Sequence, residues 1–234
     1  MHFIKKRRNK PLYKKFLTLR KNVQQRQKLL SFKNKKWQKF QQNLLLFKKK
    51  KLYDPTSYFI STFLTFHSKK FKNNLHNKQK LSLFYGNLRK NYLKKLTKFT
   101  LQRFKNLHKQ AVFLFIENLE TRLDTVLYRT HFCYSLANAR QLILHKKILV
   151  NNKIVQSNSC MLKKGDLITF DKTAIKSINL NIFKIKNLSI PPKHLYVNYK
   201  TFQILTIDNA NYTNCLVYYP FWIDFISFLK FYER

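Results

Sequence analysis

A helix, a capped helix and a hairpin follow one another over residues 122–155, and this succession is the strongest constraint on the fold. The stretch reads RLDTVLYRTHFCYSLANARQLILHKKILVNNKIV. Its first part has apolar residues at helical spacing, and Ser135 stands where a hydroxyl can accept a backbone N–H at the start of the second helix. That helix has an apolar side made of Leu136, Ala139, Leu142 and Ile143. Asn151-Asn152 then separates two apolar runs, and because asparagine tolerates the positive φ of a tight turn, we predict a β-hairpin.

The chain also carries a large excess of positive charge. Of its 234 residues, 48 are Lys or Arg and 9 are Asp or Glu, which gives a formal net charge of +39. Folding does not need this excess, and self-repulsion opposes it. We therefore expect a polyanionic partner and favour nucleic acid over an anionic membrane surface. Residues 1–110 hold 32 of the basic residues and a single acid, Asp54, so this half is interpreted as the part laid against phosphate.

Aromatic and basic residues alternate near the N-terminus. Over residues 1–51, clusters such as KKRRNK and KNKKWQK are interleaved with large apolar side chains. Cations can meet phosphates there while aromatic rings stack on bases, so we interpret this segment as an RNA-embedded extension. Farther along, an amphipathic helix is predicted. Its apolar stripe is Leu88, Tyr92, Leu96 and Phe99, and its other side is basic.

Several classes of protein are disfavoured. No segment has the roughly 18 uninterrupted apolar residues of a membrane span. Cys133, Cys160 and Cys215 are odd in number and far apart, so neither a complete disulfide framework nor a paired metal-ligand motif is expected. Glycine-rich phosphate loops are excluded because Gly86 and Gly165 are the only glycines. We expect no membrane partner, no cofactor, no zinc and no small-molecule substrate.

Four short motifs occur in order over residues 120–170. They are RLDTVLYR, ARQLILH, ILVNNKIV and GDLI. In this order and spacing they resemble the S-four RNA-binding domain, named after the small-subunit ribosomal protein S-four. The flanking sequences KQK with Tyr85-Gly86, PPKHLYV and LKFYER are similar to the rest of that ribosomal protein family. The opening KPLYKKFLTLRKNVQ resembles the mitochondrially encoded branch, and the resemblance covers about two thirds of the chain.

The resemblance implies an α+β fold in four segments. Residues 1–55 would form the basic, aromatic-rich extension embedded in RNA, and residues 56–115 a helical body. Residues 116–175 would form the S-four RNA-binding domain, made of two helices and a β-hairpin. A short strand-and-helix segment over residues 176–234 would pack back on the helical body.

The residues expected to bind RNA combine charged and polar donors. Arginine suits phosphate, glutamine can reach a 2′-hydroxyl or a base edge, and histidine can stack or donate. The predicted RNA-binding residues are Arg122, Arg140, Gln141, His145, Lys146, Lys147, Asn151 and Lys153 in the domain, with Lys78, Lys80 and Arg89 ahead of it. Asp124 is interpreted as a salt-bridge or helix-end residue. His131 stands where the domain commonly has a glycine at positive φ, a conformation that histidine tolerates better than a branched residue.

In function, the resemblance implies a structural constituent of the mitochondrial small ribosomal subunit. The implied partners are small-subunit rRNA, neighbouring ribosomal proteins and, near the entry channel, mRNA. The implied roles are rRNA binding and support of subunit assembly. Phe, Lys and Asn are abundant and have AT-rich codons. This composition favours an organelle genome as the source, and the resemblance to the mitochondrial branch implies a place in the mitochondrial matrix, with a plastid as the alternative.

Two other functions stay open at the level of sequence. A free-standing RNA-binding or ribosome-assembly factor would keep the domain without the flanking similarities. An rRNA pseudouridine synthase is less favoured. Those enzymes use an aspartate in an Arg-Leu-Asp motif, which residues 122–124 match, but here the triplet opens the domain instead of following it. Thr121 also stands where the enzymes have glycine. We therefore expect no catalytic residue and no enzyme activity.

Overall fold

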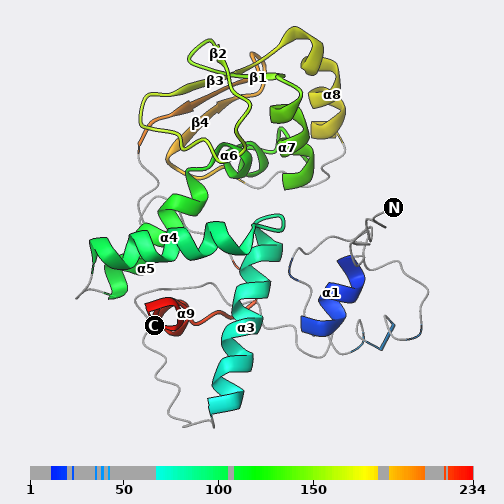
Figure 1. The fold of residues 1–234 in the computed structure, drawn as a ribbon. Coiled ribbons are helices and arrows are strands. Elements are labelled where there is room, and N and C mark those ends of the chain that lie inside the picture. The colour runs from blue at the N-terminus through cyan, green and yellow to red at the C-terminus, as the bar shows by residue number, and fades with distance from the viewer. Residues whose placement is uncertain are drawn as a thin grey trace, which may run out of the picture.

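The computed structural model describes residues 12–19, 23, 35, 38–39, 42, 67–104, 108–183, 190–208, 219 and 221–233. The helices are α1 (Leu12–Leu19), α3 (His67–Phe84), α4 (Lys90–Arg103), α5 (His108–Glu120), α6 (Leu123–Arg129), α7 (Leu136–Leu144), α8 (Lys172–Phe183) and α9 (Phe225–Glu233). The strands are β1 (Ile148–Val150), β2 (Lys153–Ile154), β3 (Leu167–Phe170), β4 (Leu195–Asn198) and β5 (Gln203–Thr206). They form two modules, each around its own apolar core (Figure 1).

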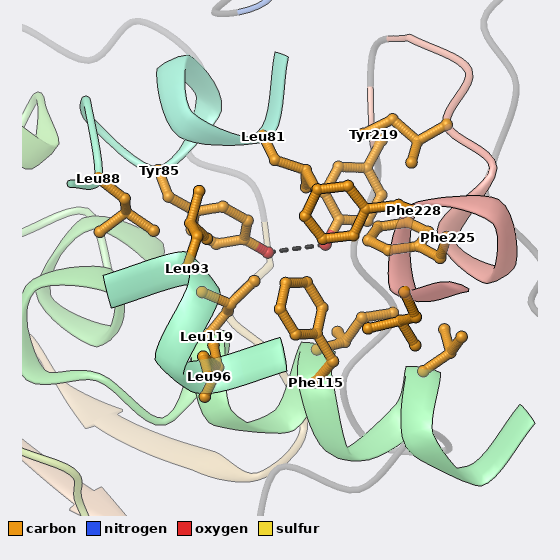
Figure 2. Packing of buried hydrophobic residues seen from close by; sticks show 14 of the residues in the cluster. Leu81, Tyr85, Leu88, Leu93, Leu96, Phe115, Leu119, Tyr219, Phe225 and Phe228 are labelled. Carbon is orange, nitrogen blue, oxygen red and sulfur yellow. Dashed lines mark hydrogen bonds between the residues drawn. The ribbon is translucent and has the colours of Figure 1, made fainter. Parts of the chain in front are cut away.

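The first module, the helical body, consists of α1, α3, α4, α5 and α9. Aromatic rings from distant parts of the chain meet in its core. The Phe115 ring on α5 lies 6.3 Å from that of Phe225 and 5.7 Å from that of Phe228, both on α9 (Figure 2). Because all three rings are fully buried, α9 closes the body from the far end of the sequence. None of the described helices is both long and apolar enough to cross a membrane.

The short helix α1 belongs to this body as well. Phe16, Leu19 and Val23 are buried in the body core, and Lys15 Nζ donates a hydrogen bond of 3.3 Å to Asn87 Oδ1. The predicted RNA-embedded extension over residues 1–55 includes these residues, so this part of it packs on protein. Most of the rest of that predicted extension lies outside the described residues.

The second module, here called the sheet module (residues 121–208), has a five-stranded antiparallel sheet in the order β2-β1-β3-β5-β4. Side chains alternate across a pleated sheet. Ile148, Ile168 and Ile204 therefore lie on one face, where all three are fully buried. Residues from α6, α7 and α8 complete this core. The α+β fold class is confirmed.

The local turn and cap predictions are also confirmed. Asn151 and Asn152 form the hairpin turn with φ of 50° and 61°, and His131 has a φ of 62°. Ser135 Oγ accepts the backbone N–H of Asn138 at 3.1 Å and caps α7. In contrast, β4 and β5 come from the predicted C-terminal segment (176–234) and extend the sheet. The four-segment division of the chain remains a prediction.

The prediction for the apolar stripe of α4 was wrong at one position. Phe99 is 49% exposed, whereas the buried side of the helix is made of Leu93, Leu96, Thr97, Thr100 and Leu101. The two threonines can be buried because their hydroxyls donate to the backbone carbonyls of Lys94 and Thr97. Polar threonines hid the true stripe in the sequence, although Leu93 and Leu101 already indicated it.

Candidate nucleic-acid interface

One end of α7 and the adjoining hairpin present a polar, basic surface. α7 ends at Leu144 with His145 as its C-cap, and Lys146 adopts a φ of 59°. The backbone N–H groups of Lys146 and Lys147 then satisfy the last carbonyls of the helix, those of Ile143 and Leu142, at 3.0 and 3.1 Å. A residue in the left-handed conformation is a common way to end a helix. It turns the chain directly from α7 into β1, so the basic side chains stay together.

We call this the hairpin surface, and we define it by five of the predicted RNA-binding residues. Four of the five side chains are exposed and that of Lys147 is half-buried. The hairpin surface consists of Gln141, His145, Lys146, Lys147 and Lys153. Asn151 lies at the hairpin tip, where its amide donates to Asp166 Oδ1 and accepts from the Leu167 backbone N–H, both at 2.9 Å. Asn151 thus braces the hairpin against β3.

Arg122 and Arg140, two further predicted RNA-binding residues, pair with one buried carboxylate. Asp124 is fully buried, and Arg122, only 4% exposed, donates to it through Nε at 3.0 Å and Nη2 at 2.9 Å. Arg140 Nε donates to Asp124 Oδ2 at 2.7 Å. The interpretation of Asp124 as a salt-bridge residue is confirmed. RNA contact by either arginine stays a prediction, and the structure gives both a role inside the protein.

The guanidinium of Arg140 also reaches the helical body. Nη2 donates to the carbonyl of Tyr85 at 2.6 Å, and Nη1 donates to that of Gly86. Gly86 has a φ of +70°, and a Cβ there would lie 3.0 Å from Leu136 Cβ and 3.2 Å from the Arg140 guanidinium. Glycine is therefore required at this point for both its backbone conformation and its close approach to α7.

A second buried polar cluster lies near the first. Arg129 donates to both oxygens of Glu120 at 2.9 Å, and the Tyr85 hydroxyl donates to Glu120 Oε1 at 2.7 Å. Burial raises the pKa of the Tyr85 hydroxyl well above its ordinary value, and Glu120 adds to this. The hydroxyl therefore keeps its proton. Because that proton goes to Glu120, the hydroxyl of Tyr219, 2.7 Å away, must donate to the Tyr85 oxygen (Figure 2).

The arginines that pair with Glu120 and Asp124 hold their protons more strongly than free arginines do. Burial by itself would lower the pKa of Arg129, but the Glu120 carboxylate outweighs it, so the net pKa is raised. The pKa of Arg122 is raised in the same way, with Asp124 outweighing the effect of burial. The Arg122 guanidinium also lies 4.7 Å from the centre of the Tyr92 ring. These arginines are charged, paired and held between the two modules.

A second basic surface lies on α4. We call it the helix surface. It consists of the exposed residues Arg89, Lys90, Lys94, Lys95, Lys98 and Arg103. Arg89 is the helix N-cap, and no acid occurs in the first turn. Among these cations Phe99 is the exposed aromatic ring, which sequence reasoning missed because it was assigned to the core.

Lys78 and Lys80 lie apart from these two surfaces. Lys80 is nearly buried, and its Nζ donates to the carbonyl of Trp222 at 3.4 Å. Lys78 Nζ lies 5.1 Å from the centre of the Tyr232 ring on α9, and burial lowers its pKa. The structure thus brings both lysines to the C-terminal part of the helical body. Their contact with RNA stays a prediction.

No metal site is formed within the described ranges, because no three His, Cys, Asp or Glu side chains are placed to hold an ion there. Cys133 and Cys160 are free thiols, and burial raises the pKa of Cys133 to about 12. Such a thiol is protonated and inert at neutral pH. Asp124, the aspartate of the Arg-Leu-Asp triplet, is fully enclosed by its arginines and does not line an open site.

Comparisons with known proteins agree with this geometry. A family model described as the S4 domain matches residues 121–168. The small ribosomal subunit protein uS4m of Marchantia polymorpha is 36% identical over 150 residues, which cover 62% of this chain and 71% of the relative. The uS4m protein of Reclinomonas americana is 30% identical over 179 residues, which cover 72% of this chain and 68% of the relative. The small ribosomal subunit protein uS4 of Ehrlichia chaffeensis is 33% identical over 121 residues, which cover 51% of this chain and 58% of the relative.

Proposed function

Because the chain belongs to the uS4 family of small ribosomal subunit proteins, which are structural and not enzymes, we propose that it binds small-subunit rRNA through the hairpin surface and the helix surface. Its similarity to the uS4m relatives supports a place in the mitochondrion. The observation that carries the proposal is the grouping of exposed cations on these two surfaces, whereas the carboxylates of Asp124 and Glu120 are buried behind arginines.

The physical basis of the proposed binding is counterion release. Each lysine or arginine that neutralises a phosphate releases bound cations from the RNA, so affinity falls as salt rises. Gln141 and His145 add donors for a 2′-hydroxyl or a base edge, which lysine alone does not supply selectively. The hairpin surface is therefore suited to a folded RNA with exposed sugar edges.

The first test replaces two cations of the hairpin surface, Lys146 and Lys153, with alanine. Binding of the purified chain to small-subunit rRNA prepared from the same source organism would be measured over a range of salt concentrations. If each lysine meets one phosphate, the slope of log affinity against log salt should become shallower by about 2, and affinity should fall by about tenfold or more. The matched control replaces Lys172 and Lys176, two exposed lysines on α8, and should change neither quantity. Equal effects of the two pairs would contradict a localised surface.

The exposed ring of Phe99 provides a second prediction. Replacing Phe99 with alanine should weaken rRNA binding by about 1–3 kcal/mol, the usual contribution of one base stacked on an aromatic side chain. The salt slope should stay the same because no charge is removed. The thermal unfolding midpoint should also stay the same, since half of the ring is already exposed to solvent. A large drop in the midpoint with unchanged affinity would show instead that Phe99 packs on protein.

The finer parts of the proposal rest on the family resemblance. They are support of subunit assembly, a position near the mRNA entry channel, contact with neighbouring ribosomal proteins, and residence in the mitochondrial matrix with an organelle-encoded gene. A free-standing assembly factor is the second candidate. Cosedimentation with small-subunit rRNA after a high-salt wash separates the two, because an integral ribosomal protein remains bound and an assembly factor dissociates.

A further inference from the structure

The carboxylate of Asp124 and the guanidinium of Arg140 join the two modules at one point. We propose that these two residues are positioning residues, which hold the hairpin surface and the helix surface at a fixed spacing so that one rRNA binds both at once. This inference rests on the proposed rRNA binding and adds to it a reason why the affinity exceeds that of either surface alone. We call the Asp124–Arg140 pair, with the carbonyls of Tyr85 and Gly86, the clamp.

The donors of Arg140 are largely used within the clamp. A guanidinium has five N–H donors, and at least three of them go to Asp124, Tyr85 and Gly86. Asp124 has no exposed surface and also accepts from Arg122. Asp124 therefore cannot touch RNA, and Arg140 has little left for a phosphate. Their contribution to binding must act through the placement of other residues.

The clamp is placed between the two surfaces. Arg140 holds the turn at Tyr85–Gly86, and Arg89, the first cation of the helix surface, follows Gly86 by three residues. At its other end α7 reaches Lys146 of the hairpin surface. Arg140 is the fifth of the nine residues of α7, so the helix from Arg140 to its last residue, Leu144, spans roughly 6 Å at a rise of about 1.5 Å per residue. The second half of this rigid helix thus sets the spacing between the clamp and the cations that follow α7.

Fixed spacing increases affinity without adding a contact. When two binding surfaces are linked rigidly at the right distance, engagement of the second becomes intramolecular, and the gain in overall affinity reaches about 10²–10⁴-fold. A loosened clamp would leave each surface intact but lower the effective concentration of one relative to the other. The loss should appear only when both surfaces can engage.

The test is a double-mutant cycle on the full chain. The clamp variant Arg140→Lys keeps the charge but cannot bridge a carboxylate and two carbonyls. The helix-surface variant replaces Lys94, Lys95 and Lys98 with alanine, the best helix former. The probe is small-subunit rRNA prepared from the same source organism. Arg140→Lys should weaken binding on the order of 10-fold or more in the otherwise unchanged chain, but less than about twofold in the helix-surface variant.

Two further measurements separate positioning from direct contact and from poor folding. Gly86→Ala, which pushes a Cβ against Leu136 and Arg140 at a φ of +70°, should reproduce the pattern of Arg140→Lys without touching any charge. The salt slope should become shallower in both clamp variants, and a reduced folded fraction would leave this slope unchanged. Circular dichroism melting reports the folded fraction itself.

The possible outcomes have distinct meanings. The inference is overturned if Arg140→Lys lowers the rRNA affinity equally in both backgrounds while Gly86→Ala leaves the affinity unchanged. Arg140 would then be a direct RNA contact. If neither the hairpin-surface nor the helix-surface substitutions alter the affinity of the otherwise unchanged chain, the proposed function itself fails. A nonadditive cycle, with both clamp variants behaving alike, supports the inference.

Discussion

Replacing Glu120 with alanine is expected to lower the free energy of unfolding by about 3–5 kcal/mol, the cost of breaking a buried ion pair by removing one partner. Glu120 is 1% exposed, and its carboxylate accepts hydrogen bonds from Nε and Nη2 of Arg129 and from the hydroxyl of Tyr85. Without it, the Arg129 guanidinium stays partly buried with no counter-charge. Urea unfolding followed by circular dichroism measures the change.

A matched control for Glu120 lies one turn earlier on the same helix. Glu117 is half-buried, and burial raises the pKa of its carboxyl. Glu117→Ala should therefore change the unfolding free energy by no more than about 0.5–1 kcal/mol. Glu120→Gln should fall between the two, because the amide retains the acceptor for Tyr85 but loses the charge opposite Arg129. Equal effects of Glu117→Ala and Glu120→Ala would show that the Glu120 cluster contributes no special stability.

The second large effect is expected at Phe228 on α9. This ring is fully buried and lies 5.7 Å from that of Phe115 and 5.2 Å from that of Tyr232. Phe228→Ala should cost about 3–5 kcal/mol, which combines lost apolar burial with the cavity left behind. The thermal unfolding midpoint and the urea midpoint should both fall. Lys230→Ala, at an exposed position of the same helix, should stay within about 0.5 kcal/mol of the unchanged chain.

The Phe228 result also tests how α9 is attached. If α9 packs on the body as the structure shows, limited proteolysis of Phe228→Ala should release the C-terminal segment earlier than in the Lys230→Ala control. A variant that unfolds at the same urea concentration as the control would mean that the body core is complete without α9.

The features that could be predicted from the sequence are governed by neighbouring residues. The Asn151-Asn152 turn and the Ser135 cap depend on the conformational preferences of those side chains alone, and the structure has both. Positive φ at His131 followed from the resemblance to the S-four domain. The hairpin surface could be anticipated because α7 and the hairpin are adjacent in the chain, and its five residues are positioned by the turn at Lys146 and the Asn151-Asn152 turn.

The features that sequence reasoning missed depend on contacts between distant residues. Arg140 binds carbonyls 54 and 55 residues earlier in the chain, and no periodic pattern indicates such a contact. Arg140 was therefore interpreted as an RNA contact, on the basis of its residue type, its place beside a polar helix side and the family resemblance. The joining of β5 to β3 was hidden for the same reason, because α8 and β4 lie between the two strands in sequence.

The sheet module is inserted between α5 and α9 of the helical body, and this has a consequence for the order in which the newly made chain can fold. The hydroxyls of Tyr85 and Tyr219 are 134 residues apart in sequence, and the body core also needs Phe225 and Phe228. The sheet in turn needs β5, which pairs with β3. Domains are made from the N-terminus and usually fold as units during synthesis, but here neither module has its full core until its late residues have emerged. Helices α3 and α4 therefore leave the translating ribosome before the residues that complete their core have been made, and the core of the helical body cannot close until α9 has emerged.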